Sequence, residues 1–264
     1  LFRSTNNFAQ KEVEWLLSIG GIEVRTGQQL GRDITLDSLL DAFDAVFLGL
    51  GLQGVNALGV AEPTVTGLRN AVDFIAELRQ STDLSTLPVG RRVVVIGGGM
   101  TAVDAAVQSR KLGAEEVTIV YRRGAEAMSA SSVEQQWAQT NGVTIRHWAA
   151  PKEVLSEGGA VKGVRFAATA LSGGKLVETG ETFTLDADMV LKAIGQTYAE
   201  PEFPGLTLEK GRIKVDADRK TSLAKVWAGG DCTGMGEDLT VSAVAQGRDA
   251  AEDIHAYLMG GDHG

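Results

Sequence analysis

The chain has 264 residues, 44% of them hydrophobic, and a formal net charge of −9. This length and composition allow one large or two ordinary globular domains. The acidic charge excludes a surface for nucleic acid or for an anionic membrane, because either partner requires a basic patch. The single cysteine, Cys232, excludes an internal disulfide, a CxxC redox pair and an iron–sulfur cluster ligated by this chain alone.

Two further absences bear on location. No apolar run approaches the roughly 18 residues that a membrane span needs. The first residues, Leu1 to Ser4, include neither an initiator methionine nor the apolar core of a signal peptide. We therefore expect a cytoplasmic protein without a membrane segment.

The first third of the chain is expected to form part of an α/β layer. Apolar spacing predicts a helix over residues 13–19, followed by a short strand over 21–24. A strand is expected over 43–48, where it runs into a glycine-rich turn, and a second helix over 68–79. The segment 81–88 has the composition of a linker, and we place a domain boundary there.

From residue 91 the pattern becomes regular. A buried strand over 93–96, a glycine turn, a helix of small residues to Leu112 and a strand over 116–121 together predict a βαβ unit. A helix over 133–140 and a strand over 143–145 are expected to follow.

The rest of the chain is expected to complete two layers. The segments 161–170 and 183–194 alternate with glycine turns, which indicates a β-meander that closes back onto the sheet at residues 193–195. A strand is expected to end at residues 227–231, and a terminal helix is predicted over 241–258.

The strongest functional pattern is the G-x-G-x-x-A loop of residues 97–102, which directly follows an apolar strand and directly precedes a helix. Gly97 permits the tight turn, Gly99 lets the backbone approach a pyrophosphate, and Ala102 lets the helix pack close to the strand. The free N–H groups of the first helical turn would then face a phosphate. The alternative is a tight turn that binds nothing.

The end of the second strand of the βαβ unit carries the specificity signal. An acidic side chain there would accept hydrogen bonds from the adenosine ribose, but this chain has Arg122 and Arg123. Two guanidinium groups can bind a 2′-phosphate that a carboxylate would repel, so the residues favour NADPH. Arginines at a strand end are also common solvated residues, and that interpretation stays open.

A second glycine turn lies near the carboxyl terminus. Asp231 follows Gly229 and Gly230, and Thr240 stands at the expected start of the last helix. A carboxylate on such a turn can accept hydrogen bonds from a polyol, and a helix amino terminus stabilises negative charge on a reduced flavin ring. Both features suit FAD, although a glycine turn of this kind is also common without a ligand.

Several of these motifs together resemble a known family. The segment 93–104, the arginine pair, and the motifs at residues 193–195 and 228–231 are similar to the glutamate synthase small-subunit group of flavoproteins. Within that group, residues 97–104 and 230–235 most resemble the FAD- and NAD(P)-binding portion of dihydropyrimidine dehydrogenases, especially the bacterial two-subunit form. The resemblance covers nearly the whole chain.

The resemblance implies an α/β fold with two dinucleotide-binding domains, in which an NAD(P) domain over 88–198 is inserted into an FAD domain formed by 1–87 and 199–264. It also implies a set of cofactor contacts. The pyrophosphate would meet Gly98, Gly99, Met100 and Thr101, the adenosine end Arg122 and Arg123, the nicotinamide side Ala193, Ile194 and Gly195, and the flavin Leu52 and the stretch from Gly230 through Asp231 to Thr240.

In such enzymes hydride passes from nicotinamide C4 to flavin N5, and electrons then leave through iron–sulfur clusters to a partner subunit or domain that reduces a pyrimidine. The resemblance therefore implies an electron-input component. Two alternatives stay open, namely a glutamate synthase small subunit and a nucleotide-binding module without turnover. A homodimer is compatible with the sequence, which leaves the final electron acceptor open.

The chain departs from this family in three places. It has neither the cysteine-rich cluster domain nor the FAD glycine fingerprint with which the family begins, so it resembles a fragment with an incomplete FAD site, and whether the fragment is active alone stays open. Met100 stands where the family commonly has Asp, and Ser129 falls where a further basic contact is expected. Since the bacterial two-subunit form is described as using NADH, NAD(H) remains an alternative to NADP(H).

No residue is assigned a catalytic role from the sequence. His147, His255 and His263 have no partners at the spacing of a metal site or a catalytic triad. No metal site is therefore expected in this chain. Cys232 lacks a second cysteine with which to cycle.

Overall fold

The computed structural model describes residues 7–199 and 203–260. These residues form two compact units, which are described separately. The larger unit is Leu52–Ala199, and the smaller unit combines the described residues before and after it. The domain boundaries expected from the sequence at 87/88 and 198/199 stay predictions.

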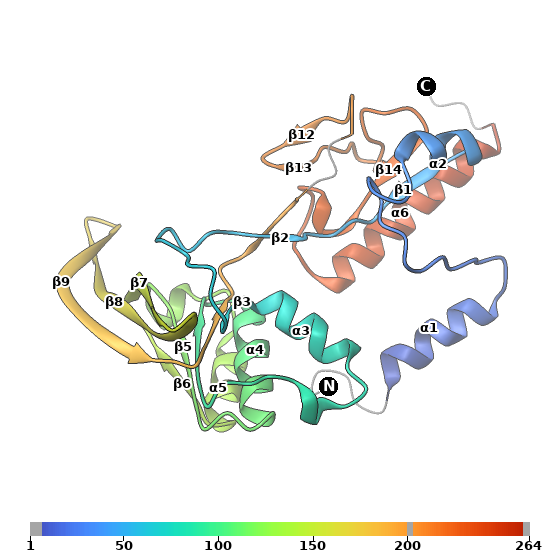
Figure 1. The fold of residues 1–264 in the computed structure, drawn as a ribbon. Coiled ribbons are helices and arrows are strands. Elements are labelled where there is room, and N and C mark those ends of the chain that lie inside the picture. The colour runs from blue at the N-terminus through green and yellow to red at the C-terminus, as the bar shows by residue number, and fades with distance from the viewer. Residues whose placement is uncertain (1–6, 200–202, 261–264) are drawn as a thin grey trace. The chain divides into compact units, whose positions relative to one another are not determined.

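A five-stranded parallel sheet forms the centre of the larger unit (Figure 1). Its strands lie in the order β3 (Leu68–Asn70), β10 (Met189–Lys192), β4 (Arg92–Ile96), β5 (Glu116–Val120) and β6 (Val143–Arg146). Every neighbouring pair is parallel. The chain runs outward from β4 to β6 and later returns to β10 on the other side of β4. In such sheets ligands bind outside the carboxyl ends of the strands where the order reverses, here between β4 and β10.

Different layers cover the two faces of this sheet (Figure 1). One face carries the helices α3 (Ala71–Gln80), α4 (Met100–Lys111) and α5 (Ser132–Thr140). The other carries an antiparallel sheet of β7 (Ala149–Glu157), β8 (Ala160–Ser172) and β9 (Lys175–Asp186).

The core between the two sheets is apolar. Val94, Ile96 and Val190 of the parallel sheet share one buried cluster with Val164 and Phe166 of β8. The central strands β4 and β10 are apolar along almost their whole length because both of their faces are covered. The sheet is therefore a rigid base for the loops at its carboxyl edge.

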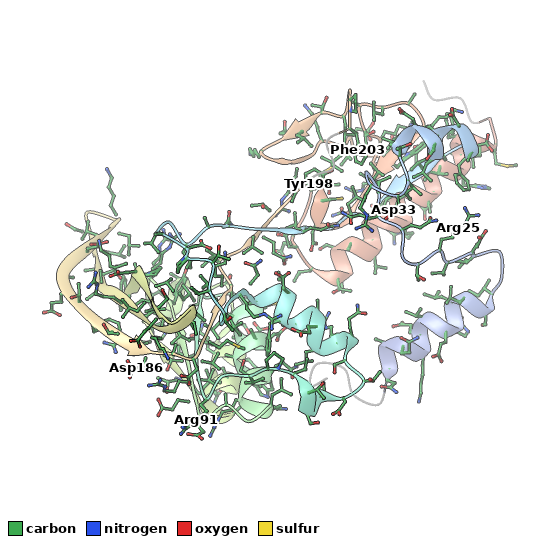
Figure 2. All side chains as sticks on the ribbon, in the orientation of Figure 1. Arg25, Asp33, Arg91, Asp186, Tyr198 and Phe203 are labelled. Atoms are coloured by element: carbon green, nitrogen blue, oxygen red, sulfur yellow. The ribbon has the colours of Figure 1, made fainter. Side chains whose placement is uncertain are left out.

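Shorter elements complete the larger unit. β2 (Gly54–Val55) pairs with β11 (Gln196–Thr197), and η1 (Leu84–Thr86) and η2 (Ala125–Ala127) are single 3₁₀ turns. At the amino-terminal edge of the parallel sheet, the Arg92 guanidinium lies 2.9 Å from the Asp186 carboxylate; Arg91 and Asp186 mark this edge in Figure 2. Exposed ion pairs of this kind contribute little to stability.

The smaller unit is built on a two-stranded parallel sheet. β1 (Val46–Leu48) pairs with β14 (Val226–Ala228), which η3 (Gly230–Cys232) and the long helix α6 (Thr240–Leu258) follow. Trp227 joins β14 to α6, since its indole Nε1–H donates to Asp253 Oδ2 at 2.7 Å. The unit also contains α1 (Phe8–Ser18), α2 (Leu36–Ala42) and the paired strands β12 (Leu208–Glu209) and β13 (Arg212–Ile213).

Most predicted elements form, but three expectations were wrong in detail. Residues 21–24 are not a strand, because Ile22 and Val24 are exposed and no described segment pairs with them. The helix expected from residue 68 begins at Ala71, because Leu68–Asn70 pair with β10 as the edge strand β3. The strand expected over 43–48 begins only at Val46, because an unpredicted helix, α2, ends at Ala42. The segment 81–88, predicted as a linker, contains only the single turn η1, and its role as a domain boundary stays a prediction.

No helix among the described residues is long and apolar enough to cross a membrane.

Candidate functional site

The glycine loop lies at the reversal point of the parallel sheet, between the end of β4 and the start of α4. Gly97 donates its N–H to the Val120 carbonyl at 3.0 Å, and Ala193 donates to the Ile96 carbonyl at 2.8 Å. Gly97 has a φ of 151°, and a Cβ there would lie 2.0 Å from the Ala193 oxygen. A side chain at this position is therefore incompatible with the contact that brings residues 193–195 beside the glycine loop.

Gly98 and Gly99 differ in what surrounds them. A Cβ on Gly98 would lie 2.5 Å from the ring of Tyr121, whereas one on Gly99 would meet only the Ser129 hydroxyl, at 3.1 Å. Gly99 has a φ of −101° and caps α4. Gly98 is thus required by packing, which the sequence did not indicate, while Gly99 presents open backbone.

The first turn of α4 supplies unused hydrogen-bond donors. The N–H groups of Gly98, Gly99, Met100 and Thr101 have no acceptor among the described residues. No acidic side chain lies in this turn, and Gly99 contributes no side-chain cap. Unpaired N–H groups and the positive end of the helix dipole together favour an anion at this position.

Ala102 takes the place expected for close packing of helix and strand. Ala102, Ala105 and Ala106 are all completely buried. The small face of α4 therefore holds the mouth of the helix tightly against β4, so the donors of the first turn are fixed in direction.

The arginine pair directly follows β5, which neighbours β4 in the sheet. Both side chains are exposed, and neither guanidinium has a hydrogen bond or ion pair among residues 7–199 and 203–260. Their backbone is held in place, since the Arg122 carbonyl accepts from Thr169 Oγ1 at 2.8 Å and the Arg123 carbonyl from the Trp148 N–H at 3.2 Å. Two unneutralised cations on a fixed backbone, in a chain of net charge −9, form a local anion-binding feature.

Residues 193–195 lie at the carboxyl end of β10 and are tied to the segment before β3. Asn56 Nδ2 donates to the Ile194 carbonyl and the Asn56 N–H to the Gly195 carbonyl, both at 3.2 Å. Gln196 Nε2 donates to the Leu52 carbonyl at 2.6 Å, which places Leu52 in this unit beside β11.

A partly buried ion pair, which the sequence analysis did not predict, lies at the same end of β10. Lys192 Nζ lies 2.5 Å from Glu62 Oε2, and the two side chains are only 13% and 23% exposed. Burial acts to raise the pKa of Glu62, but the Lys192 ammonium and the Leu58 N–H together hold that pKa below its usual value.

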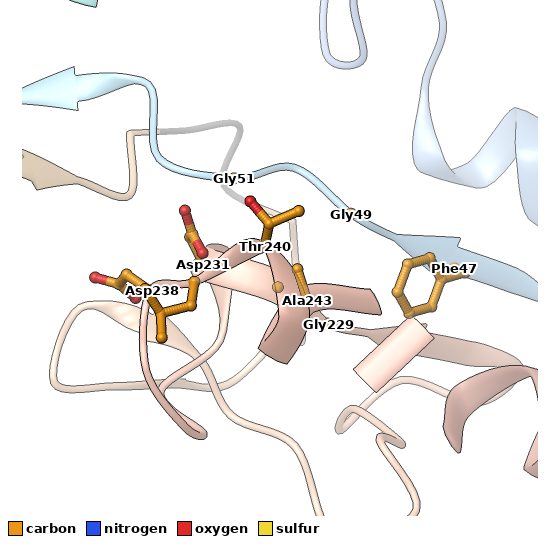
Figure 3. Close-up of a pocket in the computed structure, with 10 residues that line it drawn as sticks. Phe47, Gly49, Gly51, Gly229, Asp231, Asp238, Thr240 and Ala243 are labelled. Carbon is orange, nitrogen blue, oxygen red and sulfur yellow. The ribbon is translucent and has the colours of Figure 1, made fainter. Parts of the chain in front are cut away.

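The smaller unit contains a cavity of about 380 Å³ at the carboxyl end of its parallel strands. Figure 3 shows Asp231, Asp238 and Thr240 gathered on one side of the pocket and Phe47 on the other. A Cβ on Gly229 would lie 2.9 Å from Phe47, and Gly230 has a φ of 77°. The glycine turn therefore allows Asp231 and the start of α6 to share one pocket.

Charges and donors in this pocket are unevenly placed. Burial raises the pKa of Asp231, the nearby Asp238 carboxylate raises it further, and Arg212 acts in the opposite sense. Arg212 binds both oxygens of Asp238, at 2.5 and 2.8 Å. The N–H groups of Thr240 and Val241 at the start of α6 have no acceptor among the described residues, so the pocket offers both a carboxylate and helix-terminal donors.

Gln246 binds the glycine turn through hydrogen bonds, and the sequence analysis did not predict this role either. This side chain is 5% exposed and accepts from the Gly230 N–H at 2.8 Å and from the Thr233 hydroxyl at 3.2 Å. Its Nε2 donates to the Met235 carbonyl at 2.6 Å. A glutamine in the middle of a helix has no sequence signature that would reveal this role.

Among the described residues, neither Cys232 nor a histidine is arranged for catalysis. Burial raises the pKa of the Cys232 thiol, and its Sγ donates to the Gly229 carbonyl at 3.2 Å. His147 Nε2 is buried without a partner among the described residues, and His263 lies outside them. No group of three or more His, Cys, Asp or Glu residues in the described parts could hold a metal ion.

Comparison with known families matches residues 4–247 to the model of the pyridine nucleotide-disulphide oxidoreductases. The chain belongs to this family. Membership of this oxidoreductase family supports the expected binding of NADP and FAD, and the matched residues include the glycine loop. The resemblance seen in the sequence is therefore confirmed at the level of the family.

Two curated relatives are named as oxidoreductase subunits. The chain is 35% identical to the glutamate synthase [NADPH] small chain of Halomonas elongata, over 90% of this chain and 55% of that protein. It is 33% identical to the NADP(+)-dependent formate dehydrogenase subunit beta of Moorella thermoacetica, over 98% of this chain and 38% of that protein. This family member thus spans 55% and 38% of the length of these two relatives.

Among solved structures, FprA of Mycobacterium tuberculosis in complex with NADPH matches with a TM-score of 0.70. The match covers 97% of this chain and 74% of FprA at 18% sequence identity. At this identity the likeness concerns the fold alone. The expected α/β fold with two dinucleotide-binding domains is confirmed for this family member.

Proposed function

We propose that the chain is the NAD(P)H-oxidising, flavin-linked component of an electron-transfer oxidoreductase. The observation that carries the proposal is the set of unpaired N–H groups at the mouth of α4, beside the reversal point of the parallel sheet. Such a site binds the pyrophosphate of a dinucleotide. Family membership and the names of the relatives support an oxidoreductase.

Each part of the dinucleotide has a proposed position. Gly99, Met100 and Thr101 donate to the pyrophosphate, and Gly98 and Ala102 shape the turn that presents them. Residues 193–195 would line the nicotinamide side, because the Ala193 carbonyl lies against Gly97 at the reversal point.

The arginine pair assigns the adenosine end. Arg122 and Arg123 would bind the 2′-phosphate, which favours NADPH over NADH. The glutamate synthase small chain and the formate dehydrogenase subunit are named for NADPH and NADP(+) respectively, and this supports the same preference. NADH is the alternative and would be bound without that contact.

FAD would lie in the pocket of the smaller unit. Asp231 is placed to accept hydrogen bonds from a polyol, and the free N–H groups at Thr240 and Val241 favour negative charge on a ring bound there. Leu52, which follows the pocket residue Gly51 in the chain, is the further flavin contact implied by the family resemblance. When bound, the flavin would accept hydride from nicotinamide C4 at N5 and deliver electrons onward through iron–sulfur clusters held by a partner subunit or domain.

The partner is proposed from the resemblance of residues 97–104 and 230–235 to dihydropyrimidine dehydrogenases. It would be a cytoplasmic subunit or domain that reduces a pyrimidine. The Halomonas elongata relative supports a second candidate, a glutamate synthase small chain. Co-purification of the partner, followed by assays of NADPH oxidation with a pyrimidine or with the substrates of glutamate formation, separates the two.

Anaerobic titration of the FAD-loaded protein with NADPH and NADH tests the core of the proposal. Bleaching of the flavin band by either dinucleotide is expected, with NADPH effective at the lower concentration. If NADPH raises the melting temperature but leaves the flavin oxidised, the chain is a nucleotide-binding module without turnover. A protein that binds neither dinucleotide contradicts the proposal entirely.

A further inference from the structure

A loop of residues 124–131 lies between the arginine pair and α5 and contacts the glycine loop. The Ala130 N–H donates to the Gly98 carbonyl at 3.0 Å. The Tyr121 hydroxyl donates to the Ala127 carbonyl at 2.7 Å, which fixes the middle of the loop. The loop therefore reaches the backbone that carries the unpaired donors.

Gln135 of α5 holds both ends of this loop. Its Nε2 donates to the Ala130 carbonyl at 2.9 Å and to the Ala125 carbonyl at 3.2 Å. The glutamine amide has two N–H donors, and these two carbonyls use both of them. α5 is a firm support, because Ala138 is fully buried and Ser131 and Glu134 form a capping box at its start.

The contact between Ala130 and Gly98 sets the direction of a donor that has no partner within the protein. In a trans peptide the carbonyl of Gly98 and the N–H of Gly99 point in opposite directions. Holding the Gly98 carbonyl on Ala130 therefore holds the Gly99 N–H in its present direction. Without this bond, the peptide between Gly98 and Gly99 could turn over, because glycines on both sides of it tolerate a wide range of φ and ψ, and the Gly98 carbonyl would then face the mouth of α4.

We infer that Gln135 is a positioning residue for dinucleotide binding, which acts through Ala130 to keep the peptide between Gly98 and Gly99 in its donor orientation. This inference rests on the proposed function. Both side-chain hydrogen bonds of Gln135 go to this loop, so its effect falls on the pyrophosphate that NADPH and NADH share. Arg122, in contrast, would distinguish the two dinucleotides.

The test compares Gln135→Leu with Gln136→Leu in the full chain. Gln136 is the adjacent residue of α5, is exposed and makes no side-chain hydrogen bond among the described residues, so it is a matched control. Gln135→Leu should weaken binding of both NADPH and NADH by about tenfold, the effect of one or two lost hydrogen bonds, with their affinity ratio unchanged. Gln136→Leu should bind both as the wild type does.

Two further variants address the donors themselves. Gln135→Glu keeps the shape but has no N–H, so at neutral pH it should bind no better than Gln135→Leu. Gln135→Lys keeps donors and should lie closer to the wild type. Amide hydrogen exchange on the free proteins supplies a readout without any ligand, in which Ala130 should exchange faster in Gln135→Leu than in Gln136→Leu.

The outcomes separate this inference from the proposed function. If the wild type binds a dinucleotide and Gln135→Leu matches Gln136→Leu in affinity, the inference fails and the proposed function stands. A loss that appears for NADPH alone also overturns it, because the effect would then lie at the 2′-phosphate. If the wild type binds neither dinucleotide, both proposals fail.

Discussion

Replacing Gly99 with alanine separates ligand binding from folding at the glycine loop. Gly99 has a φ of −101° and ψ of −179°, which alanine adopts without strain. Its Cβ would meet only the Ser129 hydroxyl, at 3.1 Å, and an exposed serine can move by a few tenths of an ångström. Stability should therefore change by no more than about 1 kcal/mol, because the weaker helix cap is offset by lower entropy of the unfolded chain.

Dinucleotide affinity should respond differently. A pyrophosphate held by the N–H groups of Gly99 and Met100 must approach the backbone closely, and a methyl group at residue 99 lies on the open side of that backbone. We expect Gly99→Ala to weaken NADPH binding by about a hundredfold, the equivalent of roughly 3 kcal/mol from steric exclusion and lost charge-assisted hydrogen bonds. Isothermal titration gives the affinity, and urea unfolding gives the stability.

Gly97→Ala is the contrasting variant. Its Cβ would lie 2.0 Å from the Ala193 oxygen, and φ is 151°. Overpacking and backbone strain should together destabilise the larger unit by about 2–4 kcal/mol, measured by the same urea titration. Unchanged NADPH affinity in a stable Gly99→Ala protein would falsify the assignment of the pyrophosphate to this turn.

Three other substitutions test charges at the two sites. Arg122→Glu should weaken NADPH binding at least about tenfold more than NADH binding, since charge-assisted hydrogen bonds contribute roughly 1.5–3 kcal/mol; equal losses contradict a 2′-phosphate role. The net pKa of Glu62 is below its usual value, because Lys192 and the Leu58 N–H together outweigh the effect of burial. This pair therefore stabilises the fold at neutral pH, and the stabilisation is lost as the pH falls through the lowered pKa. Glu62→Gln should flatten the acid side of stability measured by urea unfolding against pH, and an unaltered acid side speaks against the pair. Arg212→Met should raise the pKa of Asp231 in a carboxyl NMR titration, because the guanidinium now lowers it; no change would mean that Asp238 shields Asp231 from Arg212.

Local sequence patterns sufficed where the chemistry depends on neighbouring residues. The glycine loop between a strand and a helix predicted β4, α4 and the unpaired donors between them, because all three depend on a few consecutive residues. The position of the arginine pair just after β5 was likewise predictable, because it also depends on a few consecutive residues.

Contacts between distant residues could not be predicted in this way. Lys192 and Glu62 are 130 positions apart, and only the return of the chain to β10 beside β4 brings them together. Gln246 binds Gly230 across 16 positions, from the middle of a helix. Gln135 and Gln136 are adjacent residues of the same type, and nothing in the sequence distinguishes them. Only the rotation of α5 relative to the preceding loop gives Gln135 two carbonyl partners.

The three glycines of the loop also show why a fingerprint alone does not identify a ligand. Gly97 and Gly98 are required by contacts inside the protein, with the Ala193 carbonyl and the Tyr121 ring. These contacts follow from crowding three parallel strands at one reversal point, and an α/β protein that binds nothing would need them too. Gly99 is not required by any such contact, since its Cβ would meet only a movable hydroxyl. The open backbone at Gly99, rather than the glycine spacing, is therefore the feature that points to a bound phosphate.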